Sequence, residues 1–153
     1  MSGDSQNAWI EIRGTGRSCI SAPNGASLSG QTVVVAWKNT REARRAIADA
    51  LPLLQAAKDV VLLTLSHPRD QADVTATADD VAGYLSRQGV TVRVVWEADS
   101  GDAGEQILEK ARHTGADLIV CGGYGHSRFG EWAFGGVTRS LLVQKERYVL
   151  FSH

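Results

Sequence analysis

The chain has 153 residues, enough for one domain with a sizeable core and too few for two ordinary domains. Its 16 Lys and Arg residues balance 17 Asp and Glu residues, and the formal net charge is −1. Such a chain has no overall positive field to attract polyphosphate backbones, which disfavours a general nucleic-acid binder. Its two cysteines, Cys19 and Cys121, lie far apart without metal-ligand spacing, a pattern typical of the reducing cytoplasm.

The sequence shows no membrane or secretion signal. No apolar stretch approaches the roughly 20 residues needed to span a bilayer. The opening residues, MSGDSQNAWIEIR, lack the cationic and apolar regions of a signal peptide. We therefore expect a cytoplasmic protein with no membrane partner.

Residues 1–30 are rich in Gly, Ser and Asn, a composition typical of turns and loops that bury little apolar surface. We predict a loosely structured N-terminal arm over these residues, followed by a regular domain over residues 31–153. Within the arm, residues 8–13 alternate partly between apolar and polar side chains. A short edge strand that packs Trp9 or Ile10 on the domain is therefore possible.

The regular domain begins with a predicted buried strand at residues 32–37, a mainly β-branched run that ends in Trp37. Asn39 or Thr40 can cap the next helix, since a short side-chain oxygen there accepts a hydrogen bond from an unpaired backbone N–H. Apolar side chains recur at helical spacing over residues 41–57. Pro52 lacks a backbone donor and is expected to disturb this helix.

The same alternation continues to the C-terminus. It predicts strands at 60–65, 90–96, 117–121 and 148–152, and helices at 70–88, 103–113 and 137–144. Strands that alternate with helices of this length favour parallel pairing through right-handed crossovers. We therefore predict an α/β fold, a three-layer α/β/α sandwich with a five-stranded parallel sheet. Ligands of such sheets bind beyond the carboxyl ends of the strands, here in the loops after the first and fourth strands.

A glycine-rich segment, residues 122–136, follows the fourth strand. Glycine has no Cβ and tolerates positive φ, so this backbone can turn its N–H groups toward an anion. The helix expected from Val137 adds the positive end of its dipole. The segment matches neither the P-loop nor the Rossmann fingerprint. From the residues alone, a phosphate-binding loop and a structural turn both remain open.

Three blocks resemble the universal stress protein family over about residues 31–153. They are VVVAWKNTREARRAIADALPLL, the acidic stretch at 96–102, and residues 116–138, which are similar to the family's G-x2-G-x9-G-[S/T] nucleotide motif. The resemblance implies an adenine-nucleotide alpha-hydrolase-like fold with strand order 3-2-1-4-5. It also implies a stress-response protein that binds ATP, with or without Mg²⁺.

The resemblance carries over to two groups of positions, one after the first strand and one around the glycine-rich segment. The implied binding residues are Ala36, Trp37, Lys38, Thr40, Gly122, Gly125, His126, Ser127, Gly135, Gly136, Val137 and Thr138. Gly136 stands where the motif has Ser or Thr, and Thr138 can replace the missing hydroxyl. ATP-binding relatives usually carry an acidic residue where this chain has Lys38. Its ammonium cannot accept a hydrogen bond but can meet a phosphate or a carboxylate.

Several side chains have a structural alternative to a ligand role. Trp37 can stack on a base, but a Trp that ends a strand more often packs in the core, and we favour packing. Glu97, Asp99 and Asp102 can hold a divalent cation, but acidic residues before a helix also suit its positive end, and we favour capping. We predict no catalytic residue and no protein metal site.

We therefore predict an adenine-nucleotide-binding stress protein without a recognisable catalytic set. One alternative is a dimeric interaction protein that no longer binds nucleotide, which Lys38 and Gly136 favour. A second is a slow ATP hydrolase, which needs a water-positioning carboxylate that the sequence does not identify.

The last strand, with Tyr148 to Phe151 as its apolar part, is expected at a sheet edge, where unpaired backbone groups can pair with another subunit. The resemblance also implies a homodimer. In the alternative, the N-terminal arm covers this edge within one chain.

Overall fold

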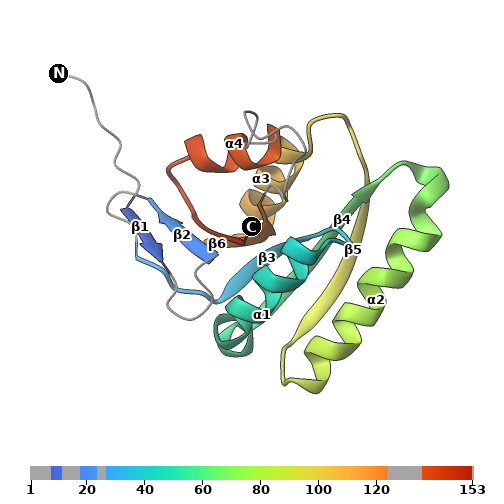
Figure 1. Ribbon diagram of the computed structural model, residues 1–153, viewed down its shortest axis with the longest axis horizontal. Coiled ribbons are helices and arrows are strands. Elements are labelled where there is room, and N and C mark those ends of the chain that lie inside the picture. The colour runs from blue at the N-terminus through green and yellow to red at the C-terminus, as the bar shows by residue number, and fades with distance from the viewer. Residues whose placement is uncertain (1–7, 12–17, 24–26, 124–135, 153) are drawn as a thin grey trace.

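The structure of the protein is a computed structural model that describes residues 8–11, 18–23, 27–123 and 136–152 (Figure 1). In this part of the chain, one seven-stranded sheet lies between two layers of helices. The strands are β1 (Ala8–Glu11), β2 (Ser18–Ala22), β3 (Thr32–Trp37), β4 (Asp59–Ser66), β5 (Val92–Ala98), β6 (Leu118–Gly122) and β7 (Tyr148–Ser152). The helices are α1 (Arg41–Ala56), the 3-10 turn η1 (Pro68–Asp70), α2 (Gln71–Arg87), α3 (Ala103–Thr114) and α4 (Gly136–Val143).

The predicted count of five strands is wrong, because β1 and β2 extend the sheet beyond β7. The other five strands are parallel, as predicted. They run in the order β5-β4-β3-β6-β7, which is the order 3-2-1-4-5 when strands are counted from Thr32. The α/β class, the three layers and this strand order are therefore confirmed. The predicted element boundaries lie within two residues of the observed ones; β3 and β7 match, and β5 begins at Val92 and not at residue 90.

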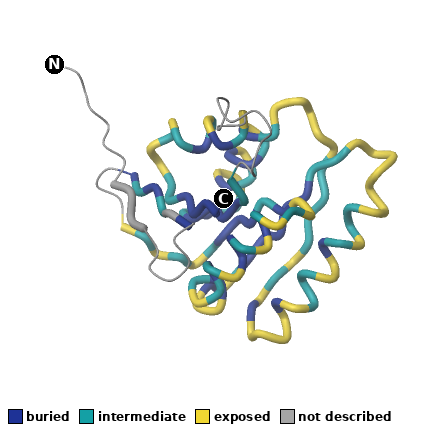
Figure 2. The backbone as a smooth tube through the Cα atoms, viewed as in Figure 1, coloured by how far each residue is buried: buried dark blue, intermediate teal, exposed yellow. Residues whose placement is uncertain are grey.

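The core consists of two apolar clusters, one on each face of the sheet. Side chains alternate across each strand, so Val33 and Val35 pack under α1 and α2 while Val34 packs under α3 and α4. Figure 2 shows the buried residues concentrated along the central strands and the exposed ones along the outer sides of the helices. A sheet covered on both faces leaves the ends of its strands as the place for a ligand.

Local sequence signals explain where the helices begin. The Thr40 hydroxyl oxygen accepts a hydrogen bond from the backbone N–H of Ala43 at 3.2 Å, and α1 continues through Pro52 to Ala56. The carboxylate of Asp102 caps α3 by accepting from the N–H of Glu105 at 3.0 Å, which confirms the capping role expected of that residue.

The outer face of α3 carries an exposed cluster of charges. Arg112 lies 2.5 Å from a carboxylate oxygen of Glu105 and 2.7 Å from one of Glu109. The hydrogen bond from Arg112, together with its positive charge, lowers the pKa of Glu109 below its ordinary value.

No helix in the described ranges combines the length and apolarity needed to cross a membrane.

The N-terminal residues correct one prediction about the sheet edge. β1 and β2 form an antiparallel hairpin, and β2 pairs antiparallel with β7, Ser18 opposite Ser152. β7 therefore has a neighbour on both sides, and the expectation that it lies at an edge is wrong. The alternative, in which the N-terminal arm covers this edge within one chain, is confirmed. Because the backbone groups of β7 are already paired, the structure removes the argument for a dimer through this strand.

Side-chain oxygens fasten the N-terminal residues to the domain. The Ser18 hydroxyl donates to the Asp49 carboxylate on α1. Asp117, just before β6, accepts from the backbone N–H and the hydroxyl of Ser29 at 2.6 and 2.7 Å, and from the N–H of Gly30 at 3.2 Å. Serine and glycine, which suggested a loose arm, supply the donors that hold residues 18 and 29–30 in place.

Candidate functional site

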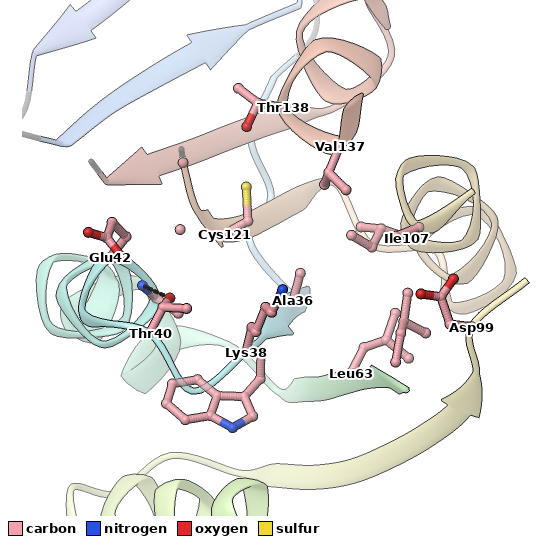
Figure 3. A pocket seen from close by; sticks show the side chains of 16 residues that line it. Ala36, Lys38, Thr40, Glu42, Leu63, Asp99, Ile107, Cys121, Val137 and Thr138 are labelled. Carbon is pink, nitrogen blue, oxygen red and sulfur yellow. Dashed lines mark hydrogen bonds between the residues drawn. The ribbon is translucent and has the colours of Figure 1, made fainter. Parts of the chain in front are cut away.

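A pocket of about 380 Å³ opens at the carboxyl ends of β3, β4 and β6, where the strand order reverses (Figure 3). It lies on the side of the sheet that α3 and α4 cover and reaches the first turn of α1. Its lining residues are Ala36, Trp37, Lys38, Thr40, Glu42, Ala43, Leu63, Leu65, Asp99, Ala103, Ile107, Cys121, Gly122, Gly123, Val137 and Thr138.

The pocket brings together the two groups of residues that the sequence singled out. The predicted binding residues that line it are Ala36, Trp37, Lys38, Thr40, Gly122, Val137 and Thr138. Gly136 is the first residue of α4 and does not line the pocket. Gly125, His126, Ser127 and Gly135 lie outside the described residues.

Trp37 forms part of the wall but belongs to the core. Its side chain is 4% exposed and packs in the cluster between the sheet, α1 and α2. Its indole N–H donates to the hydroxyl oxygen of Thr77 on α2 at 3.2 Å. The packing interpretation of Trp37 is therefore confirmed.

Gly122 lets the end of β6 approach the start of α1. A Cβ placed on Gly122 would lie 2.6 Å from the backbone nitrogen of Ala43 and 2.9 Å from the carbonyl carbon of Glu42. No side chain fits at that distance from another backbone. The glycine therefore has a packing reason as well as the phosphate-binding reason that the sequence suggested, and it sets the width of the pocket at this point.

The polar end of the pocket includes Gly123 and Thr138. The N–H of Gly123 donates to the carbonyl oxygen of Ser152 at 2.5 Å, so this group serves the sheet. Thr138, on the first turn of α4, is 6% exposed, and its hydroxyl makes no hydrogen bond within the described ranges. Figure 3 shows that hydroxyl pointing from α4 toward the pocket. A buried hydroxyl with no partner among the described residues fits a polar atom of a ligand.

The opposite end of the pocket is apolar. Leu63, Leu65, Ile107 and Val137 supply its surface, and Asp99 lies at its rim. Figure 3 shows Leu63, Ile107 and Asp99 together on the side away from Thr40 and Glu42, with Lys38 between the two groups. An apolar end with a few polar groups is the usual composition of a small-molecule site.

The acidic stretch before α3 divides into three different roles. Glu97 pairs with Lys110 on α3 at 2.5 Å, Asp102 caps that helix, and Asp99 alone of the three lines the pocket. Asp99 was expected to serve the start of α3, an expectation that the structure contradicts, because Asp102 is the N-cap of that helix. The signal that could have found it is its position, directly after a parallel strand next to the strand of Leu63 and Leu65. Within the described ranges, no three His, Cys, Asp or Glu residues form a metal-binding group.

The family model described as "Universal stress protein family" matches residues 30–144. The chain belongs to this family. Its predicted membership, made from three short blocks of sequence, is thereby confirmed over most of the chain. No curated protein matches this universal stress protein.

Solved structures of universal stress proteins share its fold. The universal stress protein UspA from Lactobacillus plantarum is 15% identical, with a TM-score of 0.60, over 83% of this chain and all of that one. A universal stress protein in complex with cAMP is 23% identical, with a TM-score of 0.66, over 80% of this chain and 96% of that one. The hypothetical protein MJ0577 is 17% identical, with a TM-score of 0.70, over 82% of this chain and 96% of that one. At these identities the similarity shows the fold alone.

The contact between α3 and α4 is expected to tolerate no side chain at Gly104. A Cβ there would lie 2.6 Å from the Cβ of Ser140 and 3.4 Å from the Cα of Val137. Gly104→Ala should push α4 and its pocket residues outward, and we expect a loss of about 1 kcal/mol after the gain in helix propensity is subtracted. Urea unfolding measures this change.

Gly83→Ala is the matched control. A Cβ at that helical glycine meets only the end of the flexible Arg87 side chain, at 3.5 Å. This variant should gain about 0.5–1 kcal/mol because alanine restricts the unfolded chain. If Gly104→Ala and Gly83→Ala change the free energy of unfolding equally, the close contact between α3 and α4 does not contribute to stability.

Proposed function

We propose that this universal stress protein binds an adenine nucleotide in the pocket between β3, β4 and β6, and that ATP is its preferred ligand. The division of the pocket supports the proposal most directly. An apolar end that can hold a nucleotide base lies opposite a polar end, where the Thr138 hydroxyl points into the pocket beside Gly122. A volume of about 380 Å³ lies within the range of small-molecule sites.

The charge of the pocket also suits an anionic ligand. Lys38 is exposed, lines the pocket and makes no side-chain ion pair or hydrogen bond within the described ranges. Its ammonium lies between the apolar and polar ends, where the phosphate nearest the sugar would pass. An unpaired ammonium in such a place stabilises a phosphate by charge and by hydrogen bonding.

Sequence and fold support the choice of an adenine nucleotide. The glycine spacing that resembles the family's nucleotide motif begins at Gly122, at the polar end of this pocket. A structural neighbour, 23% identical, is a universal stress protein in complex with cAMP. That ligand shares its adenosine part with ATP, so the two ligands differ at the phosphate end, where the glycine-rich segment begins.

Calorimetric titration of the full chain tests the proposal. Mg-ATP, ADP and cAMP should each release or absorb heat on binding, with ATP the tightest and GTP weaker than ATP. A folded protein that binds none of the adenine nucleotides at millimolar concentration would contradict the proposal. That result would favour the nucleotide-free interaction protein, which Lys38 and Gly136 suggested.

Restoring the hydroxyl of the family motif should strengthen ATP binding. A Cβ added at Gly136 has no atom of the described residues within 4 Å, so Gly136→Ser displaces none of them. The new hydroxyl stands at the start of α4, and one added hydrogen bond to a phosphate is expected to lower the Kd for ATP about two- to tenfold. Gly136→Ala is the control, because it adds the Cβ without a donor. Equal affinities of the two variants would show that no phosphate comes near this position.

A further inference from the structure

Asp99 is held in a defined position at the rim of the pocket. Its backbone N–H donates to the carbonyl oxygen of Ser66 at the end of β4, at 2.9 Å. Its Oδ1 accepts from the N–H of Gly101 at 2.8 Å, and Gly101 has a φ of +95°, which favours glycine. These two hydrogen bonds hold Asp99 beside the apolar end of the pocket.

Asp99 is exposed, and the second oxygen of its carboxylate is open to a ligand or to water. Oδ2 of Asp99 makes no hydrogen bond and no ion pair within the described ranges. The neighbouring side chains in the wall, Leu63 and Ile107, offer no donor. An ionised carboxylate only accepts hydrogen bonds, so an occupant of this end must bring an N–H or O–H group or leave the oxygen to water.

The other charged residues of the lining have different surroundings. The carboxylate of Glu42 lies 3.7 Å from the guanidinium of Arg41, and its side chain is only 12% exposed. Figure 3 shows Glu42 on the side of the pocket that α1 forms, away from Asp99. The ammonium of Lys38 pairs with no residue that the structure describes and lies between them. The pocket therefore offers an acceptor at its apolar end and a cation toward its polar end.

We propose that Asp99 is a specificity-determining residue that accepts a hydrogen bond from the nucleoside half of the ligand. This inference rests on the proposed nucleotide binding. The donor is either the amino group of the base or a hydroxyl of the sugar, and both are absent from the phosphate end. Asp99 therefore orients the nucleotide, with its nucleoside toward Leu63 and Ile107 and its phosphates toward Lys38 and Thr138.

Asp99→Asn is a sharp test, because asparagine keeps one oxygen for Gly101 and places an NH₂ where Oδ2 was. An acceptor becomes a donor without a change of shape. Titration with ATP should show a Kd about ten- to a hundredfold higher than for the natural chain. Simple charge repulsion predicts the opposite sign, since removing a negative charge should favour an anionic ligand.

Asp102→Asn is the matched control. It removes the same charge three residues away, from a side chain that caps α3 and does not line the pocket. Asparagine is as good a cap as aspartate, so stability and ATP affinity should change little. Equal unfolding midpoints for the natural chain and both variants would show that the difference lies in binding.

Three analogues of ATP identify the donor. Inosine triphosphate carries an oxygen in place of the adenine amino group, and an amino contact predicts that Asp99→Asn binds it better than ATP. The 2′- and 3′-deoxy forms of ATP lack one sugar hydroxyl, and a sugar contact predicts weaker binding of one of them to the natural chain alone. If Asp99→Asn binds all four ligands like the natural chain, the inference is wrong while nucleotide binding stands. If the natural chain binds none of them, both fail.

Discussion

Gly122→Ala should destabilise the protein by about 3 kcal/mol and remove nucleotide binding in the same variant. The added methyl group would lie 2.6 Å from the nitrogen and 3.0 Å from the Cα of Ala43, both backbone atoms of the first turn of α1. A flexible side chain could move aside, but here the whole start of the helix must shift away from β6. That shift changes the wall of the pocket at Thr40 and Gly122 together.

Urea unfolding, combined with titration by Mg-ATP, measures both effects. Gly136→Ala is the control, because it adds the same methyl group at the edge of the site, where it meets no atom of the described residues within 4 Å. It should not lose stability, and any gain in helix propensity should be small because Gly136 is the first residue of α4. A Gly122→Ala variant as stable as this control would mean that α1 and β6 do not approach as closely as the structure shows.

The sequence predicted the five parallel strands because their signals are local. Residues 32–37 and 118–121 are apolar runs that can be buried on both faces, and Thr40 and Asp102 are recognisable helix caps. The hairpin was only partly predicted. A strand near residues 8–13 was considered, but β2, with the sequence SCISA, contains one Ile among small residues. Its position depends on pairing with β7, about 130 residues away along the chain, and the local sequence pattern does not predict such a contact.

The candidate site shows the same limit. Loops after the first and fourth strands were predicted to form it, and Lys38, Thr40, Gly122 and Thr138 do line one pocket. Asp99 was assigned to capping because its neighbours in sequence are acidic and a helix follows. Its actual position depends on the pairing of β5 with β4. Asp99 directly follows the end of β5, and this pairing brings it next to the apolar end of the pocket. The role of a charged residue thus depended on strand order more than on its neighbours in the chain.

Lys38→Asp should weaken ATP binding by more than a hundredfold. The change removes an ammonium that makes no ion pair within the described ranges and adds a carboxylate to a pocket that already contains Asp99. Loss of one charged hydrogen bond to a phosphate accounts for about ten- to a hundredfold, and repulsion between the new carboxylate and the phosphates adds to this loss. Family resemblance alone suggests the reverse, because ATP-binding relatives usually carry an acidic residue at this position.

Lys38→Met separates the two contributions, since methionine keeps an unbranched, flexible side chain and removes only the charge. Lys38→Met should bind ATP about ten- to a hundredfold more weakly than the natural chain. Its Kd should also depend less on salt concentration, because the contact between the ammonium and a phosphate, which salt screens, is gone. Tighter ATP binding by Lys38→Asp would contradict the proposed arrangement: the acceptor would then belong on the loop after β3, and Asp99 would not serve the nucleoside. The direction in which Lys38→Asp changes the ATP affinity therefore shows whether Lys38, after β3, is the cation of the site and Asp99, after β5, its acceptor.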